Sequence, residues 1–272
     1  MRTAHDRATG WLRPWPGMLV APAVAVVGLS GCASFWDDVT SRNFTCKSLF
    51  VSPDPLVVLR DSQDGNERAK ALRSLKEPKR HGGSDHDQDA ILKILTTAAT
   101  SDRQPYCRLA AIDALSRFED PRAVQALIDA FEAAPQSFTS DIATVIQVQA
   151  LTALGERRHP SALDLLVRVV REPPAASDVS DQEKQQSLDR RIAAARALGN
   201  FSQYQAAQAL VHVLRHEKDV ALRARAHESL QRATGKKLPP DAKQWEELLQ
   251  RSPAEPSLVE ERNRTWKLLS WF

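Results

Sequence analysis

The feature that most constrains the fold is a pattern that recurs about every 40 residues. Between residues 61 and 250 a leucine returns at intervals of 40, 39, 44 and 32 residues, and an alanine stands four places before each one. Repeats of this length are typical of arrays of helical hairpins, in which each unit buries its apolar face against the next. The aligned leucines are Leu75, Leu115, Leu154, Leu198 and Leu230, and the alanines are Ala71, Ala111, Ala150, Ala194 and Ala226.

Each unit also predicts a second helix. Apolar residues keep a 3.6-residue spacing without strand-like alternation, which indicates an all-α fold. Asp120-Pro121 and His159-Pro160 mark turns, since proline suits the first position of a helix. We expect a closing helix over residues 241–250, a solvated insert near residues 81–89 and a surface loop from Pro173 to about Gln186. The leucines that place the second helices are Leu95, Leu127, Leu166 and Leu210.

The amino-terminal segment predicts export. An apolar stretch over residues 18–29 follows scattered bases and is too short to span a bilayer. Leu29-Ser30-Gly31-Cys32 resembles the lipobox of bacterial lipoproteins, in which the cysteine is lipidated and becomes the first residue of the mature chain. Ser34, two places later, favours the outer membrane, facing the periplasm. An ordinary signal peptide or a buried helix with an incidental cysteine is the alternative.

The repeat itself resembles a known family. Residues 108–115 (RLAAIDAL) and 120–127 (DPRAVQAL) resemble the HEAT-like repeat first described in phycobilisome lyases. The resemblance implies a right-handed α-solenoid of the ARM/HEAT type with about five hairpins, and these repeats occur mainly in binding scaffolds. With the lipobox, the chain looks like bacterial HEAT-repeat lipoproteins of unassigned role. We therefore expect a signal peptide (1–31), a lipidated tether and amino cap (32–60), the solenoid with its capping helix (61–250) and an amphipathic tail (251–272).

Charge and cysteine content exclude some classes of function. The net charge is +3, and it falls to +1 without the first 31 residues, because their three arginines and one aspartate contribute +2. A near-neutral chain gives no reason to expect nucleic acid as a partner. Cys46 and Cys107 could form a disulfide in an exported protein, but no cysteine or histidine cluster has zinc spacing.

The sequence offers little support for an enzyme. His227-Glu228 is similar to one of the His-Glu pairs that hold iron in deoxyhypusine hydroxylases, but the equivalent positions of the other repeats lack such pairs. The His81–Asp89 cluster could bind a metal ion, although a solvated loop is the simpler interpretation. A chromophore lyase is conceivable only by family analogy. We expect no cofactor, no metal site and no small-molecule substrate.

A binding surface is expected on the second helices. Positions two and five places after their leucines point away from the core at 100° per residue, and the resemblance puts these helices on the concave side. This face would run from neutral, through acidic, to basic. It is expected either to bind a protein partner or simply to be solvated. An arginine column on the first helices (Arg68, Arg108, Arg191, Arg223) is expected instead to join repeats through Asp102, Asp189 and Asp219. The candidate partner-binding residues, called the charged band below, are Asp129, Glu132, Arg168, Arg171, His212 and Arg215.

The carboxy-terminal tail is a separate candidate. Trp266, Leu269, Trp271 and Phe272 could insert at a membrane interface, dock on a partner or pack back on the solenoid. The sequence as a whole predicts a non-catalytic, lipid-anchored scaffold for protein interaction at the cell envelope. An enzyme and a lipid-binding factor in envelope assembly are the alternatives.

Overall fold

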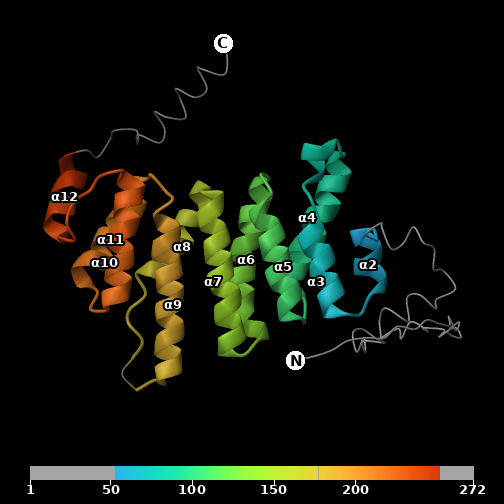
Figure 1. Cartoon of the computed structure of the whole chain (residues 1–272), viewed down its shortest axis with the longest axis horizontal. Coiled ribbons are helices and arrows are strands. Elements are labelled where there is room, and N and C mark those ends of the chain that lie inside the picture. The colour runs from blue at the N-terminus through green and yellow to red at the C-terminus, as the bar shows by residue number, and fades with distance from the viewer. Residues whose placement is uncertain (1–52, 177, 252–272) are drawn as a thin grey trace, which may run out of the picture. The chain divides into compact units, whose positions relative to one another are not determined.

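The computed structural model describes residues 53–176 and 178–251, which belong to the second of two compact units, residues 53–272. In this part of the chain the structure is helical and contains no strand. The helices stand in a row in chain order, from α2 to α12 (Figure 1). Their bounds are α2 (Pro55–Asp61), α3 (Gly65–Ser74), η2 (Pro78–His81), α4 (Asp85–Ser101), α5 (Pro105–Ser116), α6 (Pro121–Ser137), α7 (Ser140–Arg157), η3 (Pro160–Ala162), α8 (Leu163–Val170), α9 (Asp181–Leu198), α10 (Tyr204–His216), α11 (Val220–Thr234) and α12 (Ala242–Arg251).

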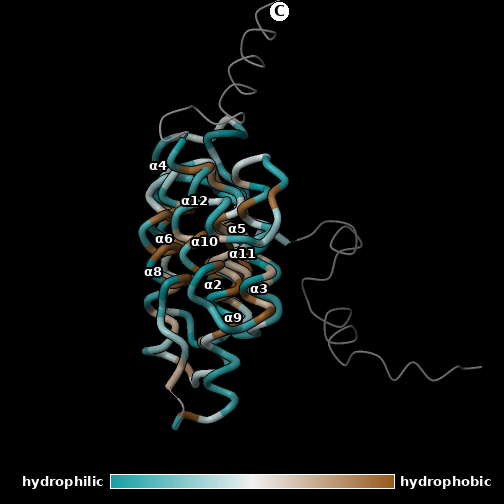
Figure 2. Tube along the Cα trace, turned by 90° about the vertical axis from the view of Figure 1, so that its left-hand side faces the viewer, coloured by the Kyte–Doolittle hydropathy of each residue, from teal (hydrophilic) through white to brown (hydrophobic). Residues whose placement is uncertain are grey.

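The helices form two layers. The first helices of the repeats, α3, α5, α7, α9 and α11, pack on one another in that order. The second helices include α4, α6, α8 and α10, and α12 packs on α10 as the second helix of a fifth hairpin. Figure 2 shows α4, α6 and α8 on one side and α3, α5 and α9 on the other. This arrangement confirms the predicted all-α solenoid of about five hairpins.

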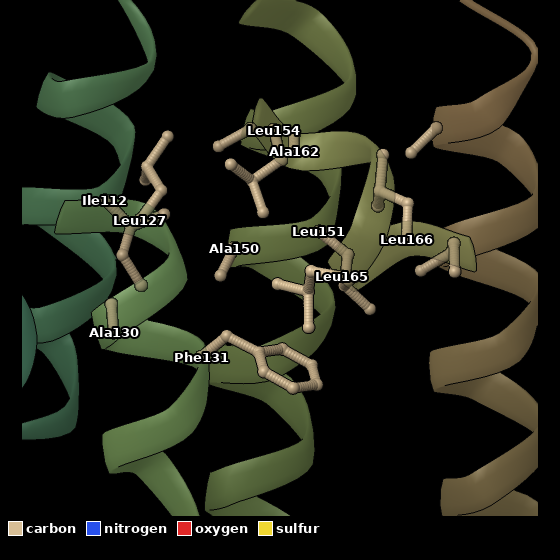
Figure 3. Close-up of a cluster of buried hydrophobic side chains, with 14 of the residues drawn as sticks. Ile112, Leu127, Ala130, Phe131, Ala150, Leu151, Leu154, Ala162, Leu165 and Leu166 are labelled. Atoms are coloured by element: carbon tan, nitrogen blue, oxygen red, sulfur yellow. The ribbon is translucent and has the colours of Figure 1, made fainter. Parts of the chain in front are cut away.

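The aligned residues of the sequence repeat form the core between the layers. Leu115, Leu154, Leu198 and Leu230 are fully buried, as are the leucines of the second helices, and Leu75 is only 7% exposed. Figure 3 shows part of this core, where Leu127 and Phe131 of α6 lie near Ala150 and Leu151 of α7. Burying one such leucine contributes about 1.5–3 kcal/mol, so the periodic pattern accounts for the fold.

Two helices begin earlier than the sequence analysis expected. Helix α4 begins at Asp85 and α9 at Asp181, inside segments that we expected to be loops. Both starts carry a capping box, in which the hydroxyl of Ser84 or Ser180 accepts a hydrogen bond from the third helical amide at 3.2 Å. Because the box satisfies amides that lack a partner at a helix start, polar residues enter the first turn at little cost.

The two ends of the array are closed differently. At the carboxyl end, α12 buries Trp245 completely, and the indole N–H donates to the carbonyl of Pro239 at 2.9 Å. At the amino end, α2 lies within the segment expected as tether and amino cap and packs on α3, but it has no fully buried residue. Leu56 and Val57 of α2 are each 43% exposed.

The small residues of the repeat permit a close approach between first helices. A β-carbon added at Gly155 of α7 would lie 2.7 Å from both the Cα and the Cβ of Ala197 in α9. The same relation recurs one repeat later, where a β-carbon at Gly199 would lie 2.9 Å from the Cβ of Ser229. Packing at this distance requires glycine on one helix and a small residue on the next.

The arginine column joins neighbouring repeats at two places by ion pairs. Arg68 of α3 donates to Asp102, in the turn before α5, at 2.6 Å. Arg191 of α9 pairs with Glu217, in the turn before α11, and both side chains are less than a tenth exposed. The expectation that Asp219 is the acidic partner at this turn is wrong, because the carboxylate of Asp219 accepts the amide of Leu222 and caps α11.

The remaining members of this column behave differently. Arg108 of α5 is 2% exposed, and its guanidinium carbon lies 4.6 Å from the ring centroid of Phe138, in the turn before α7. The Nε–H of Arg108 donates to the carbonyl of Asp102, and burial lowers the pKa of the guanidinium. Arg223 is exposed. The column is therefore mainly structural, as expected, but it uses a cation–π contact where the next turn offers an aromatic ring.

Candidate protein-binding surface

The charged band lies on the solvent side of the second helices. Asp129 and Glu132 belong to α6, Arg168 and Arg171 to α8 and its carboxyl end, and His212 and Arg215 to α10. All six residues are exposed, whereas the leucines that set the register of these helices are fully buried. The helical spacing thus predicted correctly which side of each helix faces solvent.

Contacts within the structure use part of this charge. Arg168 of α8 pairs with Glu132 of α6, and Arg215 of α10 pairs with Glu246 of α12. The carboxylate of Asp129 accepts a hydrogen bond from Gln125 at 2.8 Å. The two ion pairs connect neighbouring second helices, so these four charges are partly neutralised before any partner binds.

A basic cluster remains at the carboxyl-terminal half of the band. His212 and His216 are one turn apart on α10, with ring centroids 4.6 Å from each other. Partial burial lowers the pKa of His212, and the charges of His216 and Arg171 lower it further. The fixed positive charge of this cluster therefore belongs to Arg171. Neither Arg171 nor His216 takes part in an ion pair within residues 53–176 and 178–251.

His216 and Glu246 were not among the predicted site residues. The four-residue spacing between His212 and His216 is a signal that could have placed both on one helix face. No comparable signal links Arg215 to Glu246, because that contact depends on how α12 packs on α10. The sequence therefore predicted the exposed positions of the band but not their pairing.

The candidate catalytic and metal-binding residues have structural partners. The Nε2–H of His227 donates to the carbonyl of Leu238 at 2.7 Å, and its ring meets Trp245 edge-on at 6.1 Å between centroids. Glu228 pairs with Arg225 at 2.6 Å. His81 donates to the carbonyl of Glu77 at 2.9 Å. Within the described part of the chain, no three histidine, cysteine or acidic side chains are grouped as metal ligands.

Several predicted features lie outside the described residues. These are the lipobox and lipidation residues, one cysteine of the possible disulfide and the aromatic tail. Cys107 is a fully buried thiol in α5. Among the described helices, none combines the length and apolar character needed to cross a membrane. The residues outside the description are Leu29, Ser30, Gly31, Cys32, Cys46, Trp266, Leu269, Trp271 and Phe272.

The sequence comparison agrees with this architecture. Residues 53–147 match the family model for HEAT repeats. The match begins before α2 and ends within α7, and the helical hairpins continue beyond it to α12. Among curated proteins, none matches this chain. HEAT repeats are typically non-catalytic scaffolds that bind other proteins along an extended surface. The finer resemblance to the phycobilisome-lyase type stays a prediction.

Proposed function

We propose that this chain is a lipid-anchored, non-catalytic HEAT-repeat scaffold that binds an acidic protein segment at the bacterial cell envelope. The array of hairpins supports the scaffold, because a preformed surface loses little conformational freedom on binding. The Leu29-Ser30-Gly31-Cys32 motif supports lipidation at Cys32 and export, with the outer membrane facing the periplasm as the expected location. An anchor would hold the binding surface near envelope partners and raise their effective concentration.

The observation that supports an acidic partner is the basic cluster of Arg171, His212 and His216. The other cations of the band, Arg168 and Arg215, have carboxylate partners within the protein. Arg171 remains exposed at the end of α8, one helix away from the two histidines of α10. A carboxylate placed between these helices would meet the guanidinium directly, and an Arg–carboxylate contact can be bidentate.

Site-specific photo-cross-linking tests this surface. A photoreactive residue at Gln208, which is exposed on α10 beside the band, would capture the partner from native membranes. We expect Arg171→Glu to abolish the cross-linked product. Arg196→Glu, a reversal at an exposed arginine on the first helix α9, is the matched control and should leave it unchanged. Equal capture by both variants would refute the proposed surface.

Lipidation needs a separate test. Cys32→Ser should move the protein from the membrane fraction to the soluble fraction, and the intact mass should lose the acyl groups. If the variant stays membrane-bound and its intact mass still exceeds the mass calculated from its sequence by the same amount, Cys32 is not the anchor. This result would leave the photo-cross-linking test of the band unaffected.

A further inference from the structure

Two histidines of α10 lie side by side on its exposed surface. His212 and His216 are four residues apart, which places them one helical turn apart on the same face. Their ring centroids are 4.6 Å from each other, and the ring planes are tilted by 42°. Both residues are exposed, so an ion in solution can reach them. The pair thus presents two imidazole rings together at the surface.

The ring nitrogens of this pair are not used within the array. Three other histidines hydrogen-bond through a ring nitrogen: His81 and His227 bond to backbone carbonyls, and His159 bonds to a side-chain hydroxyl. Within residues 53–176 and 178–251, neither His212 nor His216 has such a partner. Their nitrogens are therefore free to bind a ligand from solution.

Two histidines at this spacing on one helix are suited to holding a metal ion. Imidazole is the commonest metal ligand in proteins, and in H-E-x-x-H helices two histidines four residues apart bind one zinc ion. The residues between the pair here are Val213, Leu214 and Arg215. The glutamate that serves as general base in H-E-x-x-H enzymes is thus absent, and the arrangement favours binding without catalysis.

Such a site would be open to solvent. Within the described part of the chain, no third histidine, cysteine or acidic side chain joins the pair as a metal ligand. The nearest acidic candidates have other partners, since Glu217 pairs with Arg191 and Glu246 pairs with Arg215. Water would fill the remaining coordination positions. The expected absence of a metal site rested on the lack of zinc-type spacing, which an open site with two protein ligands does not require.

We propose that His212 and His216 together bind one divalent transition-metal ion that prefers imidazole, such as Ni²⁺, Cu²⁺ or Zn²⁺, at the surface of α10. Each ring contributes one nitrogen, and water completes the coordination. Imidazole favours these ions over Mg²⁺ and Ca²⁺, which prefer oxygen ligands. The positive charge of Arg171 acts on His212 and opposes a bound cation, so the metal is held reversibly.

Titration of the purified full chain with nickel chloride, followed by calorimetry, tests the site. We expect one Ni²⁺ per chain at the pair. His216→Asn should weaken this binding about 100-fold, because the second ring no longer adds an intramolecular contact to the first. His86→Asn is the matched control, since it removes an exposed histidine of α4 that has no histidine one turn away. The control should bind Ni²⁺ like the native protein, and excess Mg²⁺ should not compete.

A charge variant and a spectroscopic signature make the test specific. Arg171→Gln removes the opposing charge and should tighten Ni²⁺ binding about two- to fivefold. With Cu²⁺ in place of Ni²⁺, electron paramagnetic resonance should show coupling to two imidazole nitrogens in the native protein and to one in His212→Asn or His216→Asn.

Two results would overturn the proposal. In the first, Ni²⁺ binding is unchanged in both His212→Asn and His216→Asn. In the second, His86→Asn weakens binding as much as these variants do, which would assign the ion to the His81–Asp89 cluster instead. Because these titrations contain no partner protein, either result would leave the photo-cross-linking test of the charged band unaffected.

Discussion

Substituting Gly155 by alanine should destabilise the protein, although the same change stabilises most helices. Gly155 lies inside α7, and alanine is favoured over glycine in a helix interior by about 1 kcal/mol. Here the new β-carbon would meet the Cα and the Cβ of Ala197, each at 2.7 Å. Because one of these atoms is backbone, relief requires α7 and α9 to move apart. Overpacking of this kind costs about 1–3 kcal/mol or more.

The cost of separating the helices should exceed the gain in helix propensity. We therefore expect the free energy of unfolding to fall by about 1–2 kcal/mol, which corresponds to a Tm lower by about 3–6 °C for a domain of this size. Urea denaturation followed by circular dichroism measures the first quantity and calorimetry the second. Gly65→Ala is the matched control. Its β-carbon would meet only the flexible side chain of Gln104 at 3.3 Å, so it should be neutral or slightly stabilising.

A second substitution separates the clash from other effects. Ala197→Gly removes one of the two close atoms, so it should cost less stability in the Gly155→Ala background than in the native protein. If Gly155→Ala is as stable as the native protein or more so, the first helices do not approach as closely as described. The same result would mean that the small residues of the repeat are not required for close packing of the first helices.

Three further predictions concern single contacts. Arg191→Met leaves Glu217 buried without its partner and should lower the free energy of unfolding in urea by about 3–5 kcal/mol. Adding Glu217→Leu should recover much of this loss. If the double variant is as unstable as Arg191→Met alone, the ion pair is contradicted. The Arg122 guanidinium donates to Asp120 and, with hydrogen bonds from the Arg122 amide and Gln88, lowers the pKa of Asp120 to about 2. The stabilisation of the folded protein by ionised Asp120 is complete above pH 4 and is lost as the pH falls towards 2. It should amount to about 1 kcal/mol, because Arg122 is half exposed and solvent screens the pair. Asp120→Asn should therefore flatten the acid side of the profile of stability against pH. Trp245→Ala should cost about 3–5 kcal/mol and increase hydrogen exchange first in α11 and α12, and uniform exchange along the array would contradict its role as a cap.

The sequence predicted the repeat and its buried positions because these are local and periodic. Leu115 and Leu127 are 12 residues apart on two helices, and each independently marks the side that faces the core. Helix starts were less predictable. The polar residues after Ser180 resemble a loop by composition, whereas the capping box formed with Glu183 begins α9 there. The Ser-x-x-Glu spacing is the sequence signal that marks this start.

The candidate surface was predictable only in part for a physical reason. Helical spacing determines that Arg168 and Arg215 face solvent, but their carboxylate partners come from neighbouring helices. Those contacts depend on the offset between successive hairpins, which the pattern within one helix does not encode. The pairing of Arg191 with Glu217, and not with Asp219, was unpredictable for a similar reason. Two acidic residues lie in this turn; Glu217 forms the ion pair, whereas Asp219 caps α11.

The nearest-neighbour packing of the hairpins bears on how a bound partner could be located. Among the first helices, each one packs on the preceding and the following first helix of the row, so stabilisation at one interface reaches distant repeats weakly. A partner that bridges α8 and α10 would slow local opening there, while the repeats near α3 would open at almost their original rate. The repeats in which local opening is slowed would thus mark where an unknown partner binds, and their number would show how many repeats the partner spans.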